Sequence, residues 1–334
     1  MKDFAIVFAS VAIAVLIVTA ISEYFLIKLF RARRVGQKIL DIGPNWHKAK
    51  EGTPFMGGLG FILSTLLIMA VFFLVKAIDG TSSEYIPLCL TLVFAVANGA
   101  IGFVDDYCKL LKKENEGLTS KQKLFLQIVV AAAYLTVMSY TGNLSTDLHV
   151  PFTDLYLRLG WFFYPIAILV LTGVVNGANL TDGVDGLASS ITFVIGGFFA
   201  VVAFATGDEQ LLILSAILLG VCLGFLFFNF HPAKIFMGDT GSLYIGGIIM
   251  GCAIAEGQLV MFIIMGMLFI LEMLSSLLQR VYYKLSGGKR IFKMAPVHHH
   301  FQKLDKPWCE IKIVTVFFIV SLIFVAVGVL SCIF

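Results

Sequence analysis

Long apolar runs, separated by short polar stretches, fill most of the chain. A helix that crosses the hydrocarbon core of a bilayer needs about 20 mostly apolar residues. Ten successive segments approximate this pattern: residues 4–27, 57–78, 87–104, 124–141, 161–178, 186–206, 211–229, 242–256, 259–281 and 313–332. We therefore predict an all-α polytopic membrane protein with ten transmembrane helices, in which residues 1–334 form a single integral-membrane domain.

The composition agrees with this prediction. Of the 334 residues, 59% are hydrophobic and 13% are charged, whereas a soluble domain carries about 25% charged residues. We expect the first segment to be a retained helix, because its apolar run is longer than the roughly 7–15 residues of a signal peptide and the basic sequence RARR follows it. The six cysteines are scattered without a Cys-x-x-Cys pair, so we expect neither a disulfide framework nor a zinc site.

Lysine and arginine are distributed very unevenly between the connections. The odd-numbered connections hold 19 of the 24 basic residues, and the even-numbered ones hold only Arg158. The positive-inside rule places basic loops in the cytoplasm. We therefore predict that the odd connections are cytoplasmic and that both termini are extracytoplasmic, which agrees with an even number of helices.

The conspicuous polar motifs also fall in the odd connections. They read HKAKEGTPFMGG (47–58), GFVDDYCKLLKK (102–113), NGANLTDGVDG (176–186), NFHPAKIFMGDTGS (229–242) and KMAPVHHHFQ (293–302). Their convergence on one membrane face predicts an active site in the cytoplasmic loops, built between helices.

Asp105 and Asp106 end the third segment. Near a membrane boundary a carboxylate needs a cation or a water-filled cavity. Neighbouring residues on a helix point about 100° apart. We therefore expect these two carboxylates to have different roles.

Polar residues recur at every third position of NGANLTDGVDG: Asn176, Asn179, Asp182 and Asp185. Such a stripe drifts around a continuous helix, so one helix cannot direct all four at one site. The glycines allow the backbone to unwind, and TDG is a turn signal. We predict a short cytoplasmic turn whose carboxylates and amides point inwards.

Asp239 lies between glycines in the short connection after the seventh segment. Mg²⁺ is commonly held by one or two carboxylates together with substrate phosphates, and the lysines at positions 48, 109, 121 and 234 suit phosphate binding. These residues predict phosphoryl transfer with Mg²⁺, in which catalysis is mostly positioning and charge neutralisation. Phe236 has two interpretations, stacking on a nucleobase and simple packing.

His298, His299 and His300 are consecutive, so they cannot share one helix face, and they lack the i, i+4 spacing of a helical zinc pair. An imidazole near neutral pH can donate to phosphate or carry a proton. We predict that at least one of them faces a pyrophosphate.

Together, these motifs resemble the phospho-N-acetylmuramoyl-pentapeptide transferase family, the bacterial MraY translocases, within the polyprenyl-phosphate N-acetylhexosamine-1-phosphate transferase superfamily. The likeness covers essentially the whole chain, through GTPFMGG, FVDDY, NLTDGVDGLA, HPAKIFMGDTGS and PVHHHF in the family's order. It implies a Mg²⁺-dependent homodimer in the bacterial plasma membrane, without a nucleic-acid partner. The implied reaction transfers phospho-MurNAc-pentapeptide from UDP-MurNAc-pentapeptide to undecaprenyl phosphate, giving lipid I and UMP.

The resemblance also implies roles for single residues. Asp105, Asp106, Asp239 and His298 would be catalytic, with Asp239 as the metal ligand. Substrate contacts would fall on a larger set: Lys48, Thr53, Lys109, Lys121, Asn179, Leu180, Asp182, Gly183, Asp185, Asn229, Phe236, His299 and His300. It stays open whether Asp105 or Asp106 attacks the nucleotide covalently or deprotonates the lipid phosphate for direct attack.

Two alternatives compete with this interpretation. A sibling transferase that uses UDP-GlcNAc would share the aspartate-rich loops, but the intact PVHHHF favours the muramoyl substrate. A secondary transporter would place ionisable residues near the bilayer midplane, whereas here only Glu272 lies well inside a predicted span. Phe55 departs from the threonine common in relatives, which leaves the carboxylates untouched.

Overall fold

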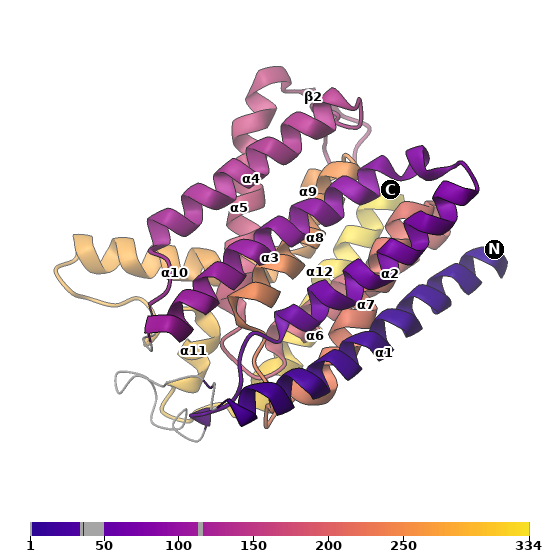
Figure 1. Ribbon diagram of the computed structural model, residues 1–334. Helices are drawn as coiled ribbons and strands as arrows, with labels where there is room; N and C mark the ends of the chain where they lie inside the picture. Colours follow the sequence, from indigo (N-terminus) through magenta and orange to yellow (C-terminus); the bar gives the residue numbers. More distant parts are fainter. Residues whose placement is uncertain (1, 34–35, 37–49, 113–115, 334) are drawn as a thin grey trace.

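A computed structural model describes residues 2–33, 36, 50–112 and 116–333, and it is almost entirely helical (Figure 1). The helices are α1 (Lys2–Ala32), α2 (Gly58–Ile78), α3 (Ile86–Lys112), α4 (Ser120–Tyr140), α5 (Phe163–Thr181), α6 (Leu187–Thr206), α7 (Glu209–Asn229), α8 (Gly238–Ala255), α9 (Leu259–Met265), α10 (Met267–Leu285), α11 (Val297–Gln302) and α12 (Glu310–Ile333). Short 3-10 turns, η2 (Ser82–Tyr85) and η3 (Gly160–Phe162), precede α3 and α5.

Each of the ten predicted segments falls on helix, to within about two residues at its ends. Within the described residues, eight helices are long and apolar enough to cross a membrane, and α9 with α10 makes a ninth if this bent pair is one span. The all-α membrane fold is therefore confirmed, and the count of ten stays a prediction. Of the ten predicted segments, the one whose helix does not meet this test is the eighth, which forms α8.

The helix α8 begins with the polar sequence GDTGS and is the central helix of the bundle. Its residues from 240 to 254 are all buried, because α3, α5 and α2 pack around it. Glycines permit the close approach: a Cβ atom on Gly246 would lie 2.8 Å from the Cα of Val175 in α5, and one on Gly247 would lie 2.8 Å from the Cα of Ala95 in α3. Small residues at helix contacts serve this purpose in membrane proteins.

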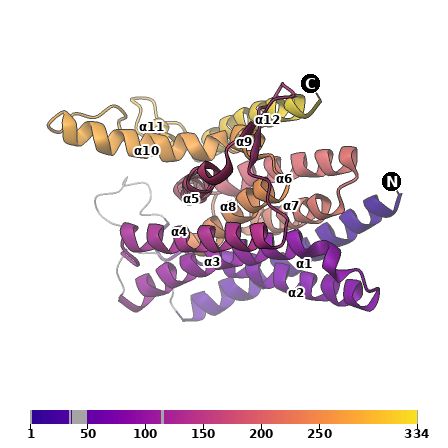
Figure 2. The same cartoon turned by 90° about the horizontal axis from the view of Figure 1, so that it is seen from above.

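The ninth predicted segment is broken rather than straight. Gly266 separates α9 from α10, and the two helices bend by 75°. Figure 2 shows that α10 extends beyond the rest of the bundle. A uniformly apolar run carries no signal for such a bend, since both halves satisfy the same hydropathy pattern.

The polar motifs gather at one end of the bundle. The end of α3 and the start of α4, the end of α5, and the connection from α7 to α8 all meet there, and both chain termini lie at the other end (Figure 1). The far end also carries the hairpin of β1 (Asp147–His149) and β2 (Tyr156–Arg158), which pair antiparallel. This arrangement places the aspartate-rich loops together, as the sequence predicts.

Candidate active site

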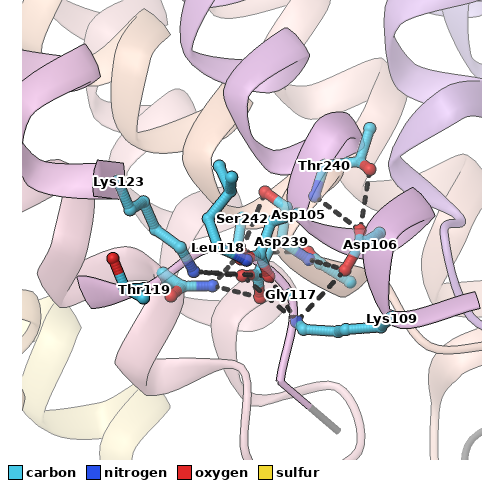
Figure 3. A network of polar contacts seen from close by, with 12 residues as sticks. Asp105, Asp106, Lys109, Gly117, Leu118, Thr119, Lys123, Asp239, Thr240 and Ser242 are labelled. Carbon is cyan, nitrogen blue, oxygen red and sulfur yellow. Dashed lines mark hydrogen bonds and ion pairs between the residues drawn. The ribbon is translucent and has the colours of Figure 1, made fainter. Parts of the chain in front are cut away.

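Three carboxylates form the centre of the site. Asp105 and Asp106 lie near the carboxyl end of α3, and Asp239 lies in the first turn of α8 (Figure 3). One oxygen of each lies within 4.8 Å of the others. Asp105 and Asp106 are each 1% exposed, so their charges need nearby cations.

Two lysines supply these cations. The Nζ atom of Lys109 lies 2.6 Å from Asp105 Oδ2, 3.4 Å from Asp106 Oδ1 and 3.3 Å from Asp239 Oδ2. Lys123, from the first turn of α4, pairs with Asp239, and its Nζ lies 3.5 Å from Asp105 Oδ2. Three carboxylates therefore share two ammonium groups, which leaves a net negative charge.

Asp105 and Asp106 have different partners, as expected from their positions on α3. Asp106 Oδ2 accepts hydrogen bonds from the backbone N–H (3.0 Å) and hydroxyl (2.8 Å) of Thr240, and its Oδ1 accepts from Asp239 N–H at 3.2 Å. It thus holds the amino-terminal end of α8, where negative charge is favourable. Asp105 Oδ1 accepts from Leu118 N–H at 2.8 Å, and its Oδ2 lies close to both lysines.

The end of α5 completes this cluster. Asn179 donates to Asp239 Oδ1 at 2.8 Å and to Ser242 Oγ at 2.9 Å. Asp182 follows the last residue of α5, and burial, together with the charges of Asp239 and other nearby aspartates, raises its pKa well above the usual range.

A second polar cluster lies at the start of α6 and α12. Lys50 Nζ lies 2.7 Å from Asp185 Oδ1 and 2.7 Å from Glu310 Oε1, and His231 Nδ1 lies 3.0 Å from Asp185 Oδ2. The oxygen and nitrogen atoms of Asp185, His231 and Glu310 are close enough together to hold a metal ion. We assign no magnesium ion to this cluster, because one of its three groups is a histidine nitrogen, whereas Mg²⁺ favours oxygen ligands. The ring of Phe236 lies 6.0 Å from the same Nζ.

The three histidines lie in α11 and have three different partners. His298 Nδ1 lies 3.1 Å from Glu272 Oε2, and His299 Nδ1 lies 2.7 Å from Gln302 Oε1. His300 Nδ1 accepts a hydrogen bond from a backbone N–H at 3.1 Å. The prediction that they cannot share one face agrees with this arrangement.

The other residues that we expected to contact substrate differ in their surroundings. Asn229 has a structural role, because it accepts from Gly186 N–H and donates to a backbone carbonyl at 2.9 Å each. Thr53 and Leu180 are half-buried in the loop before α2 and at the end of α5. Lys121 is exposed, whereas Lys48 lies outside the described residues.

Sequence reasoning missed four side chains that the structure brings into the two clusters. Lys50, Lys123 and His231 lie inside quoted motifs or beside predicted residues, so nearness along the chain was their only signal. Glu310 starts α12, more than 100 residues from Lys50 and Asp185 in sequence, and had no signal.

Comparison with known proteins places this chain in a family. Residues 86–257 match glycosyl transferase family 4. The chain is 42% identical over 308 residues to the phospho-N-acetylmuramoyl-pentapeptide-transferase of Halalkalibacterium halodurans, covering 92% of each chain. It is 40% identical over 314 residues to the Bacillus subtilis protein of the same name, covering 94% of each, and 40% identical over 321 residues to that of Staphylococcus aureus, covering 95% and 97%. The chain belongs to the family of phospho-N-acetylmuramoyl-pentapeptide transferases.

Proposed function

We propose that this protein transfers phospho-MurNAc-pentapeptide from UDP-MurNAc-pentapeptide to undecaprenyl phosphate, which gives lipid I and UMP for peptidoglycan synthesis. The relatives' names supply the substrate class. The observation that carries the chemistry is the buried cluster of three carboxylates and two lysines at the meeting point of α3, α4 and α8. Such a cluster suits charge neutralisation of transferring phosphates.

The cluster fits a magnesium ion. Its donors are hard carboxylate oxygens from Asp105, Asp106 and Asp239, one from each within 4.8 Å of the others. Mg²⁺ favours such oxygens together with substrate phosphates. When bound, the ion would neutralise charge on the phosphates. Asp239 and Asp105 are the residues that we propose to hold it, because Asp106 already accepts three hydrogen bonds from α8.

The chain's own groups then have distinct tasks. Lys109 and Lys123 are point charges that attract the diphosphate. Asp106 keeps the amino-terminal end of α8 in place, so that Asp239 stays opposite Asp105. Asn179 orients Asp239 through its 2.8 Å hydrogen bond. The second cluster, with Phe236 beside Lys50, supports binding of the nucleoside end.

We further propose that the site faces the cytoplasm of a bacterial plasma membrane and that the enzyme is a homodimer. The basic residues of the odd connections support the orientation. The homodimer rests on the family resemblance alone.

An assay of purified enzyme in detergent tests the substrate. With Mg²⁺ and undecaprenyl phosphate, radiolabelled UDP-MurNAc-pentapeptide should yield labelled lipid and UMP, and radiolabelled UDP-GlcNAc should yield neither. Labelled lipid from UDP-GlcNAc alone would establish the sibling transferase instead. In sealed vesicles, only inverted ones should consume added nucleotide.

Lys123 and Lys121 offer a matched pair of variants on one helix turn. Lys123→Met removes one of two ammonium groups from the carboxylates and should lower kcat/KM by about 10²–10³-fold, the range for losing one preorganised electrostatic group. Lys121, to which the resemblance also assigns a substrate contact, is exposed and pairs with none of the three carboxylates in the described part of the chain, so Lys121→Met should cost clearly less than Lys123→Met. Steady-state kinetics of both proteins provide the measurement. Equal losses in the two variants would contradict the assignment of Lys123.

A further inference from the structure

Glu272 is a buried acid that the reaction described above does not use. It lies in α10, is 0% exposed, and faces His298, which is also 0% exposed. His298 is the basic side chain that meets it among the described residues, at 3.1 Å between Nδ1 and Oε2. The outer atoms of the pair, Glu272 Oε1 and His298 Nε2, have no hydrogen-bond partner in the described part of the chain.

This contact decides which nitrogen of His298 carries a proton. An ionised carboxylate only accepts hydrogen bonds, so Nδ1 must be the N–H donor. Carboxylates that hold a histidine in this way fix both its tautomer and its ring orientation. The nitrogen that remains for another partner is Nε2.

The Nε2 atom points to the turn between α5 and α6. A Cβ atom added to Gly183 would overlap it, so this space exists only because residue 183 is glycine. The neighbouring Asp182 lies close enough to Asp239 and Asp106 that their negative charges raise its pKa. A buried, unpartnered polar atom therefore borders the region where the phosphates of a sugar nucleotide would lie.

We propose that Glu272 is a positioning residue for the transfer reaction: it accepts the Nδ1 proton of His298 and directs Nε2 to a phosphate oxygen of the sugar nucleotide. The inference rests on the proposed function for the identity of that nucleotide. The negative charge of Glu272 also balances a protonated imidazole, so Nε2 can present an N–H to the phosphate. A hydrophobic residue at position 272 would pack as well, but it would fix neither the tautomer nor the orientation of the His298 ring.

Steady-state kinetics separate positioning from mere packing. Glu272→Gln keeps the size but removes the negative charge that balances a protonated imidazole, so the ring loses the charge with which Nε2 would bind the phosphate oxygen. The KM for UDP-MurNAc-pentapeptide should rise by about 10–100-fold, as expected for losing a charged hydrogen bond, and the KM for undecaprenyl phosphate should stay within about twofold. In a His298→Gln background the same substitution should have no further effect.

Ser275→Ala is the matched control, because Ser275 lies one turn away and donates only to the backbone oxygen of Glu272 at 2.8 Å. It should match wild type in both KM values. Equal rises in both KM values, or effects of Glu272→Gln and His298→Gln that multiply, would overturn the proposal in favour of a packing role.

The NMR spectrum of ¹⁵N-histidine-labelled protein tests the geometry without any substrate. The His298 signal, identified by its loss in His298→Gln, should report a protonated Nδ1, and an unprotonated Nδ1 in the wild-type protein would overturn the proposal even if Glu272→Gln fails to fold. Wild-type enzyme without transfer activity but with this spectrum would refute the proposed function alone. Transfer activity without this spectrum would refute the role of Glu272 alone.

Discussion

Asp239→Asn should lose at least about 10²–10³-fold in kcat while the protein stays folded. The substitution keeps the shape of the side chain and removes one of the three negative charges in the cluster. Three side chains converge on the carboxylate of Asp239: Lys109, Lys123 and Asn179. Without its charge, the two lysines would turn to Asp105 and the proposed metal site would lose a ligand.

Activity measured across a range of Mg²⁺ concentrations checks this prediction, together with the thermal unfolding of each protein. The variant should need much more Mg²⁺ for half-maximal activity, whereas the thermal unfolding of the wild-type protein should respond to Mg²⁺ more strongly than that of the variant. Asp3→Asn, in the exposed first turn of α1, provides the control. Near wild-type activity of Asp239→Asn at limiting Mg²⁺ would contradict the assignment.

The sequence predicted the helices well because the membrane imposes one simple requirement on each of them. Apolar length marks the helices that are long and apolar enough to cross a membrane, whereas α8, which begins with the polar sequence GDTGS and is buried from residue 240 to 254, falls outside that set. The same signal cannot show the bend at Gly266, because bending changes the surroundings of a helix and not its hydropathy. The aspartate-rich motifs predicted the central cluster because the ends of consecutive helices must meet at the same membrane face.

Two lysines at the start of α4 show what the sequence pattern cannot predict. Lys121 and Lys123 lie two residues apart at the start of α4, so on a helix they point about 200° apart and only one can face the carboxylates. The residue spacing alone does not show which one, since that depends on how α4 is rotated against α3. In the structure Lys123 faces inwards and Lys121 outwards. Glu272 is a similar case, because its partner His298 comes from a connection 26 residues later.

Substitutions of Asp105 and Asp106 should differ in their effects on stability and activity. Asp106→Asn should weaken the hold on the amino-terminal end of α8, because its carboxylate accepts three hydrogen bonds there. It should therefore lower thermal stability as well as activity. Asp105→Asn removes a carboxylate that accepts a hydrogen bond from Leu118 N–H and pairs with Lys109 and Lys123, so it should lower kcat without the loss of thermal stability expected for Asp106→Asn.

The pH dependence of Asp105→Asn distinguishes the two mechanisms left open by the sequence. A phosphate monoester has a second pKa of about 6, so at neutral pH much of the lipid phosphate is already ionised. If Asp105 only accepts that proton, a higher pH should restore much of the variant's activity, because solvent then removes the proton. If Asp105 is a nucleophile, or if it organises the proposed metal ion and the lysines electrostatically, a higher pH should not help. We expect Asp105 to act as a base or in positioning and not as a nucleophile, since an ionised lipid phosphate beside two lysines can attack the sugar-bearing phosphorus directly, forming one P–O bond as the bond to UMP breaks.

Wild-type enzyme allows an independent decision between direct attack and a covalent relay. Direct attack needs the lipid in place before UMP can leave, so labelled UMP should not exchange into UDP-MurNAc-pentapeptide when the preparation is free of undecaprenyl phosphate. A relay through Asp105 would instead release UMP first and leave the phosphosugar on the carboxylate, which mass spectrometry of the intact protein would detect. Lys109 and Lys123 argue for direct attack on electrostatic grounds, because both ammonium groups lie within 3.5 Å of Asp105 Oδ2 and reduce the nucleophilicity of that oxygen. Lipid-independent exchange together with an adduct on Asp105 would reverse this conclusion.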